Sequence, residues 1–122
     1  MRVLVADDDR IHVRLVSERL KRMGHDVVAA FDAMQACMSA LRSPPDLVLL
    51  DISMPAGSGL EVLRRLKTNT KTNLIPIIVV SGSADPKAEA GVRSSGADAF
   101  LPKPVDFDRL DQTIHQLVAV RT

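Results

Sequence analysis

The chain has 122 residues, of which 46% are hydrophobic, so it is large enough for one domain with a substantial core and too small for two. Its 16 basic and 15 acidic residues give a net charge of +1, which lacks the basic excess typical of nucleic-acid-binding domains. The single cysteine, Cys37, excludes an internal disulfide and any cysteine-based metal site.

The hydrophobic residues occur in short runs, none of which approaches the length of a membrane-spanning helix. The longest are LVLL at 47–50 and IIVV at 77–80, and the amino terminus lacks a signal-peptide pattern. We therefore expect a soluble cytoplasmic domain that binds neither membranes nor nucleic acid directly.

The first half of the chain contains two strand-like segments, each followed by a segment with helical spacing. An acidic triplet ends the first strand-like segment, Gly24 favours the end of the first helix, and Asp32 is suited to cap the second. The predicted elements are strands at 2–6 and 27–30 and helices at about 10–23 and 32–42. The side chains expected to face inward are Val13, Val16, Leu20 and Met23 in the first helix and Met34, Cys37 and Leu41 in the second.

The stretch PDLVLLDISMPAGSG, residues 45–59, combines an apolar run with a polar loop. Leu47 to Leu50 are wholly apolar, as expected of a strand buried on both faces of a parallel sheet. The run ends in one carboxylate, Asp51, and the chain then leaves through Ser53, Met54, Pro55 and two glycines. Such a carboxylate either caps the next turn or belongs to a site at the carboxyl edge of the sheet, where open α/β sheets bind ligands.

The second half of the chain continues the same alternation. Leu60, Leu63 and Leu66 give an apolar face to a helix from Gly57 to about Asn69. The remaining predictions are a strand at 77–80, a turn at 81–83, a helix beginning at Asp85-Pro86, a strand at 97–101 and a helix beginning at Asp106, with Leu110, Ile114 and Leu117 inward. The helix after Pro86 is rich in Ala, Gly and Ser, so we expect it to be comparatively mobile.

Five predicted strands therefore alternate with five predicted helices. Several strands are apolar throughout, which indicates a parallel sheet covered by helices on both faces. The predicted architecture is a three-layer α/β/α sandwich in a single domain.

Polar residues follow four of the five predicted strands, and the carboxyl ends of parallel strands share one edge of the sheet. These residues are Asp7 and Asp8 after the first strand, Asp51 after the third, Ser81 after the fourth and Lys103 after the fifth. If the strand order is 2-1-3-4-5, the carboxylates meet between the first and third strands.

Three carboxylates in one crevice repel one another and favour a bound cation. Because the ligands are all oxygens and few, a hard divalent ion that keeps several waters fits best, which favours Mg²⁺. The Lys103 ammonium and the Ser81 hydroxyl are suited to bind an oxyanion. Together with a carboxylate nucleophile, these groups are the parts needed to take up a phosphoryl group.

Four segments, VLVADDD, LVLLDISMPAGSG, IIVVSGS and GADAFLPKPV, occur in an order and spacing that resembles the receiver domain of bacterial two-component response regulators. The resemblance covers essentially the whole chain, so we expect residues 1–122 to form one receiver domain. It implies a CheY-like, flavodoxin-like (βα)5 fold with strand order 2-1-3-4-5.

The resemblance also implies the phosphorylation chemistry. Asp51 would accept a phosphoryl group from a histidine kinase or a phosphotransfer protein, and Ser81 and Lys103 would contact the phosphoryl oxygens. The Lys103–Pro104 peptide bond is expected to be cis. Such a domain catalyses its own phosphorylation and dephosphorylation without being a conventional enzyme.

A magnesium site follows from the same resemblance. Asp8, Asp51 and the backbone carbonyl of Ser53 would hold Mg²⁺ directly, and Asp7 would contribute through a water molecule.

A switch is the third implication. Phe100 would turn inward when Ser81 moves toward the phosphoryl group, and the surface of the fourth helix, fifth strand and fifth helix would change. A downstream effector, or a second copy in a homodimer, would recognise that surface. Gly82 and Ala99 differ from residues common in the family at these positions, so the resemblance says less about how the signal leaves the domain.

Three other functions share some of these features with a receiver. A pseudo-receiver would bind partners without phosphorylation. A phosphatase of the haloacid-dehalogenase type also uses an aspartate after a strand but needs a second one two residues later, where this chain has Ser53. A flavodoxin-like nucleotide binder would need a glycine-rich phosphate loop after the first strand, and none is present.

Other residues have simpler interpretations. Asp9 is expected to cap a helix or to be solvated. His12, His25 and His115 lack metal-binding spacing and are predicted to take surface or boundary positions. Cys37 is interpreted as a small core residue.

Overall fold

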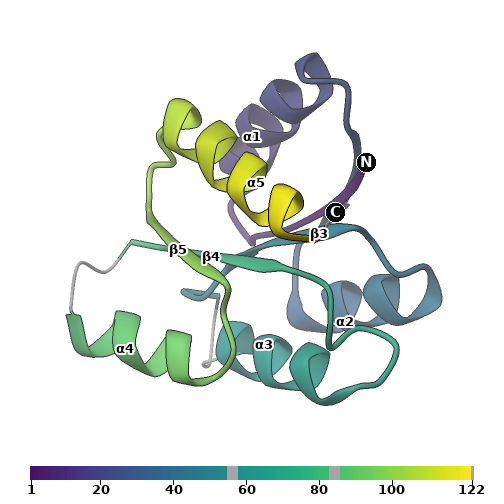
Figure 1. Cartoon of the computed structure of the whole chain (residues 1–122), viewed down its shortest axis with the longest axis vertical. Helices are drawn as coiled ribbons and strands as arrows, with labels where there is room; N and C mark the ends of the chain where they lie inside the picture. The colour runs from purple at the N-terminus through teal and green to yellow at the C-terminus, as the bar shows by residue number, and fades with distance from the viewer. Residues whose placement is uncertain (55–57, 83–85, 122) are drawn as a thin grey trace.

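The computed structural model describes residues 1–54, 58–82 and 86–121, and in these parts strands and helices alternate along the chain (Figure 1). The strands are β1 (Arg2–Ala6), β2 (Asp26–Ala30), β3 (Leu47–Asp51), β4 (Ile77–Ser81) and β5 (Ala99–Pro102). The helices are α1 (Arg10–Arg22), α2 (Ala33–Arg42), α3 (Ser58–Thr68), α4 (Pro86–Ser94) and α5 (Phe107–Arg121). The residues expected to begin two helices, Gly57 and Asp85, lie outside the described residues.

The strands form one parallel sheet in the order β2-β1-β3-β4-β5, as predicted. At the carboxyl edge, Ala6 is aligned with Leu50, Asp51 with Val80, and Ser81 with Pro102. The residues at the ends of the strands are therefore neighbours in space. This register places Asp7, which follows β1, beside Asp51 at the end of the adjacent strand β3.

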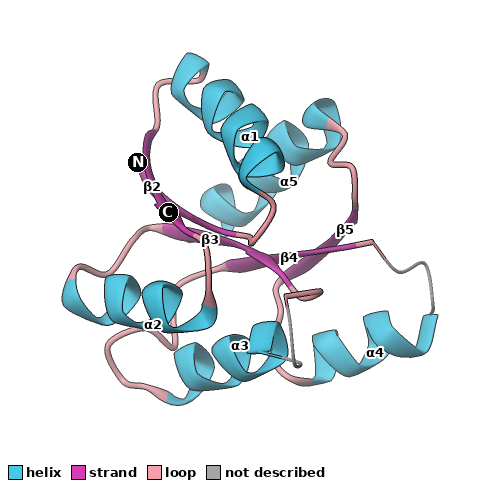
Figure 2. Cartoon of the chain, turned by 180° about the vertical axis from the view of Figure 1, so that it is seen from behind, coloured by secondary structure: helices cyan, strands magenta, loops and turns pink. Residues whose placement is uncertain are grey.

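The helices form two layers around the sheet. Helices α1 and α5 cover one face, and α2, α3 and α4 cover the other (Figure 1; the same layers are seen from behind in Figure 2). Side chains alternate along each strand, so Val3 and Val5 of β1 face the α1–α5 layer and Leu4 and Ala6 face the opposite layer. Strands β3 and β4 are buried along their whole length, which explains their uninterrupted apolar sequences. The predicted three-layer sandwich is confirmed.

The ends of the first two helices follow the predicted capping chemistry. The Asp9 carboxylate accepts hydrogen bonds from the backbone N–H groups of Ile11 and His12 in the first turn of α1. Gly24 follows α1 with a φ of +91°, a conformation that favours glycine. The Asp32 carboxylate accepts from the N–H of Gln35 and caps α2.

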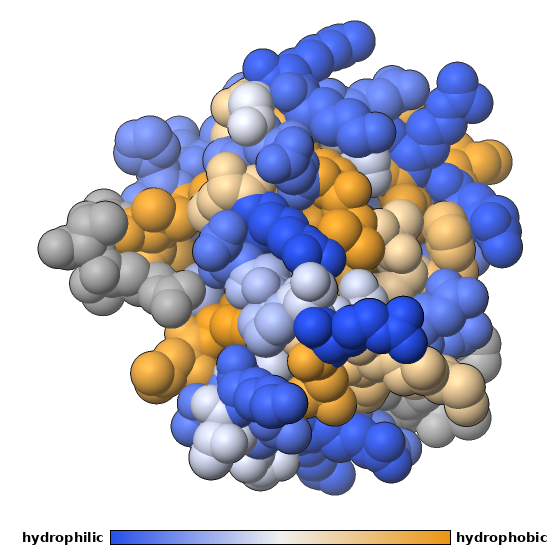
Figure 3. Space-filling model, turned by 90° about the vertical axis from the view of Figure 1, so that its right-hand side faces the viewer, coloured by the Kyte–Doolittle hydropathy of each residue, from blue (hydrophilic) through white to orange (hydrophobic). Residues whose placement is uncertain are grey.

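The prediction for the buried face of α2 was partly wrong. Met34 is 72% exposed, whereas Ala36, Cys37 and Ala40 are buried against the sheet. Small side chains on this stripe allow α2 to lie against the sheet, and the longer Met34 side chain remains at the surface. Figure 3 shows hydrophobic surface between hydrophilic side chains on the side of the molecule where α2 lies.

Among the described helices, none has the length and apolar composition needed to cross a membrane.

Gly59 of α3 lies close to the backbone at the end of β3. A Cβ atom at this position would lie 2.7 Å from the carbonyl oxygen of Asp51 and from Cα of Ile52. These are backbone atoms, which cannot turn aside as a flexible side chain can. The absence of a side chain at Gly59 therefore fixes how closely α3 packs beneath the segment that follows Asp51.

We predict that Gly59→Ala lowers the free energy of unfolding by about 1–3 kcal/mol, because the added methyl group overpacks this contact. Urea unfolding measures the change. Gly91→Ala in α4 is the matched control, since its Cβ would meet nothing within 4 Å. That control should raise stability by up to about 1 kcal/mol, because alanine favours a helix over glycine. Equal effects at the two positions would contradict the close approach at Gly59.

Candidate functional site

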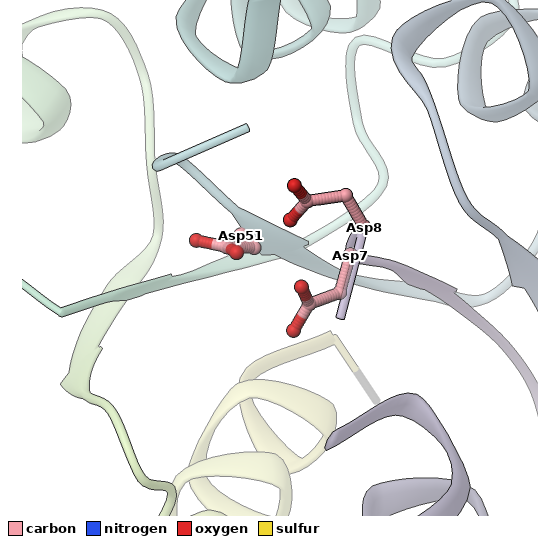
Figure 4. Close-up of side chains that lie close together, drawn as sticks. All are labelled: Asp7, Asp8 and Asp51. Atoms are coloured by element: carbon pink, nitrogen blue, oxygen red, sulfur yellow. The ribbon is translucent and has the colours of Figure 1, made fainter. Parts of the chain in front are cut away.

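Three carboxylates converge at the carboxyl edge of the sheet. Asp7 and Asp8 follow β1, Asp51 ends the adjacent strand β3, and one carboxylate oxygen of each lies within 4.8 Å of the others. Figure 4 shows the three side chains directed into the same space. Asp7 and Asp51 are only 2% and 3% exposed, and Asp8 is open to solvent. The expected acidic cluster is therefore present.

Lys103 is the cation beside this cluster. Its Nζ lies 3.1 Å from Oδ2 of Asp7 and 3.3 Å from Oδ2 of Asp51. Its backbone N–H donates to the carbonyl oxygen of Ser81 at 2.8 Å, which joins the loop after β5 to the end of β4. The peptide bond between Lys103 and Pro104 is cis.

The two buried carboxylates have pKa values displaced in opposite directions. Burial raises the pKa of Asp7, but hydrogen bonds from His12, the Asp9 amide and Lys103 outweigh it and hold this pKa well below its ordinary value. Burial raises the pKa of Asp51, and the neighbouring Asp7 charge adds to the rise, against the hydrogen bond from the Ser53 amide. Two adjacent buried carboxylates do not ionise independently, so Asp7 carries the charge more readily.

The pKa of Lys103 is raised in the same environment. Burial alone would lower it, but the adjacent carboxylates of Asp7 and Asp51 stabilise the ammonium and outweigh burial. Lys103 is therefore a permanent positive charge at this site at neutral pH.

His12 also belongs to this site, which the sequence analysis did not predict. Its Nδ1 lies 2.7 Å from Oδ2 of Asp7, and its side chain is 12% exposed. The boundary position expected for this residue is correct, but the contact with Asp7 was missed. One signal was available, since His12 lies one helical turn before the buried Val16 and so on the inward stripe of α1.

Ser53, Ser81 and Phe100 lie around this cluster. The Ser53 backbone N–H donates to Oδ1 of Asp51 at 2.8 Å and orients that carboxylate. Ser81 is buried at the end of β4, one residue beyond the partner of Asp51 in the sheet. Phe100 of β5 is aligned with Val79 and packs, partly buried, against the core beneath α3 and α4.

The donor set at this edge fits a hard divalent cation. All the candidate ligand atoms are oxygens, the three carboxylates are close together, and Lys103 supplies the one positive charge in contact with Asp51 among the described residues. Mg²⁺ prefers carboxylate oxygens and retains waters, which the exposed side of Asp8 leaves room for. The residues present are therefore suited to Mg²⁺.

The model of the response regulator receiver domain matches residues 3–115. The chain belongs to this family. The polar-differentiation response regulator DivK of Brucella anthropi is 30% identical over 112 residues, which cover 92% of this chain and 91% of DivK. This chain is thus a receiver domain of the two-component type, and the resemblance noted from its four segments is confirmed.

Solved structures of similar proteins agree with this assignment. A response regulator from Desulfuromonas acetoxidans superimposes with a TM-score of 0.88 at 29% identity, covering 98% of this chain and 97% of the other. The chemotaxis protein CheY4 of Vibrio cholerae gives a TM-score of 0.88 at 25% identity, with 95% and 97% coverage. The predicted CheY-like fold is confirmed.

The opposite pKa displacements predict opposite effects of two neutral substitutions. Because the pKa of Asp51 is raised, its contribution to stability is present below the ordinary value of 3.8 and is lost as the pH rises through the folded value. Asp51→Asn should therefore gain stability relative to the parent as the pH rises above 3.8 in metal-free buffer.

Asp7→Asn is the matched comparison, since the lowered pKa of Asp7 makes its ionised form stabilising. This variant should lose stability relative to the parent as the pH rises toward 3.8 from below, and the difference should stay constant above 3.8. Urea unfolding at several pH values, with a chelator present, measures both differences. Trends of the same sign for the two variants would contradict the assigned directions.

Proposed function

We propose that Asp51 is the phosphoacceptor of this receiver and takes a phosphoryl group from a histidine kinase or a phosphotransfer protein in a Mg²⁺-dependent reaction. The observation that carries the proposal is the convergence of Asp7, Asp8, Asp51 and Lys103 at the carboxyl edge of β1 and β3. Membership of the receiver family supports it.

In this reaction a carboxylate oxygen of Asp51 attacks the phosphorus of a phosphohistidine. An O–P bond forms as the N–P bond breaks, and the donor imidazole leaves after it takes up a proton. The Ser53 N–H orients Asp51 for attack, since it already binds Oδ1. Lys103 is close enough to transfer its ammonium contacts from the carboxylates to the phosphoryl oxygens.

Asp8, Asp51 and the Ser53 carbonyl would hold Mg²⁺ directly, and Asp7 would contribute through a water molecule. When bound, the ion would neutralise charge on the carboxylates and on the incoming phosphoryl group. An opposite charge next to Asp51 also favours its ionised form, which is the nucleophile.

Phosphorylation would then be communicated through Ser81 and Phe100. Because side chains alternate along β4, Ser81 lies on the same face as Ile77 and Val79, which is the face where Phe100 packs. A movement of Ser81 toward the phosphoryl group would leave space on that face for Phe100. The surface of α4, β5 and α5 would present the change to an effector or to a second copy of the domain.

The phosphoacceptor is tested by labelling with a small acyl-phosphate donor in the presence of Mg²⁺. We predict that the parent is labelled and that Asp51→Asn falls to background, because the amide keeps the shape but lacks the nucleophilic oxygen. Asp32→Asn is the control at the same edge of the sheet, and it should label normally because asparagine also caps helices. Undiminished labelling of Asp51→Asn would reject the assignment, and an unlabelled parent would favour a phosphorylation-independent receiver.

The switch is tested by the backbone resonances of the domain with a phosphoryl mimic bound at Asp51. We predict shifts at Ser81, along α4 and at Phe100, because a signalling domain needs two states of similar free energy that differ at a readable surface. Residues 27–30 of β2, at the far edge of the sheet, should not shift. Shifts confined to residues that touch the mimic would contradict the proposed route.

A further inference from the structure

We propose that His12 is a positioning residue for the phosphorylation site, and that its imidazole holds the Asp7 carboxylate in the orientation required for binding the divalent cation. This inference rests on the proposed function of the site and adds a residue to it. It concerns the nitrogen Nδ1 of His12 and the oxygen Oδ2 of Asp7, which lie 2.7 Å apart.

The start of α1 fixes both partners of this contact. The Asp9 backbone N–H donates to Oδ1 of Asp7 at 2.9 Å, and the Asp9 carboxylate accepts from the His12 backbone N–H at 3.2 Å. The His12 ring donates to Oδ2, the second oxygen of Asp7, so Asp7, Asp9 and His12 form a closed ring of hydrogen bonds. The same turn of chain that begins the helix therefore aims the imidazole at the carboxylate.

The ring has no competing partner within the described residues. Its other nitrogen, Nε2, is buried and makes no hydrogen bond there. A cavity of about 10 Å³ next to the ring is lined by His12, Asp7 and Asp51 together with apolar residues that include Val5, Leu49 and Val80. Within the described part of the chain, the bond to Asp7 is thus the one hydrogen bond that the imidazole makes, which assigns the ring to this site.

The contact with His12 becomes more important when the site is occupied. Each oxygen of Asp7 has two donors, since Lys103 contacts Oδ1 at 3.3 Å and Oδ2 at 3.1 Å. If Lys103 turns to a phosphoryl group, Asp7 keeps the Asp9 amide on Oδ1 and His12 on Oδ2 among the described donors. His12 is then the one described side chain that still fixes this carboxylate.

A matched pair of substitutions separates positioning from packing. His12→Asn places an amide N–H near the position of Nδ1 but removes much of the ring volume, whereas His12→Leu fills the volume and removes the donor. Groups that orient direct metal ligands typically contribute about 10- to 100-fold to metal affinity. Because Asp7 would contribute through a water molecule, we expect His12→Leu to weaken Mg²⁺ binding by about 10-fold, the low end of this range. His12→Asn should bind nearly as well as the parent.

The measurement is a titration of the unphosphorylated full chain with Mg²⁺, followed by calorimetry and by the amide resonances of Asp8 and Ser53. Asp8→Ala, which removes a proposed direct ligand, shows how much Mg²⁺ affinity is lost with one ligand and so serves as the reference for the His12 variants. Urea unfolding of each variant verifies folding, and His12→Met replaces His12→Leu if the latter does not fold.

The outcomes are distinct. Normal Mg²⁺ binding by the leucine variant, or equal loss in the leucine and asparagine variants, would overturn the positioning role. Normal binding by leucine with loss in asparagine would assign His12 to packing alone. If the parent binds Mg²⁺ but Asp51 cannot be phosphorylated, the proposed function fails while the result for His12 stands. A parent that binds no Mg²⁺ would reject both.

Discussion

The close approach of two buried carboxylates, Asp7 and Asp51, is the constraint on which the rest of the site depends. Burial and mutual repulsion oppose ionisation of both, and Lys103 stabilises the pair by contacting each of them. Such a cluster is unfavourable in isolation and persists because the surrounding sheet holds it. The stability of the sheet therefore maintains a site that is arranged to receive a cation.

The parallel sheet produces this cluster through two simple regularities. The order β2-β1-β3-β4-β5 places the ends of β1 and β3 side by side, and alternation along the strands directs Asp7 and Asp51 to the face covered by α1. His12, in the first turn of α1, meets the cluster from that face. The opposite face carries Ser81 and Phe100, so the space that Phe100 would fill lies on the side of the sheet away from His12.

Much of this arrangement could be predicted from the sequence, because apolar runs ending in polar residues define both the strands and the edge they share. The inward face of α2 could not, since two apolar stripes fit its spacing and only packing against the sheet selects the one with Ala36 and Ala40 over Met34. To predict the contact between His12 and Asp7, one would need to know both the face of the sheet to which Asp7 points and the orientation of α1 over that face. The spacing of the three histidines gives neither of these. It predicted only a surface or boundary position for His12.

The charges at the site connect its resting state to the proposed switch. Three carboxylates and one ammonium give −3 and +1, which leaves −2, and a divalent cation brings this sum to zero. The proposed conversion of Asp51 to an acyl phosphate would replace one negative charge by about two, and this balance would be lost again. The groups that could compensate are the Lys103 ammonium and the Ser81 hydroxyl. The two residues are linked, because the Lys103 backbone N–H donates to the Ser81 carbonyl oxygen. Movement of these two groups toward the phosphoryl group would alter the ends of β4 and β5 together, and α4 and α5 are the helices that follow these strands in the chain.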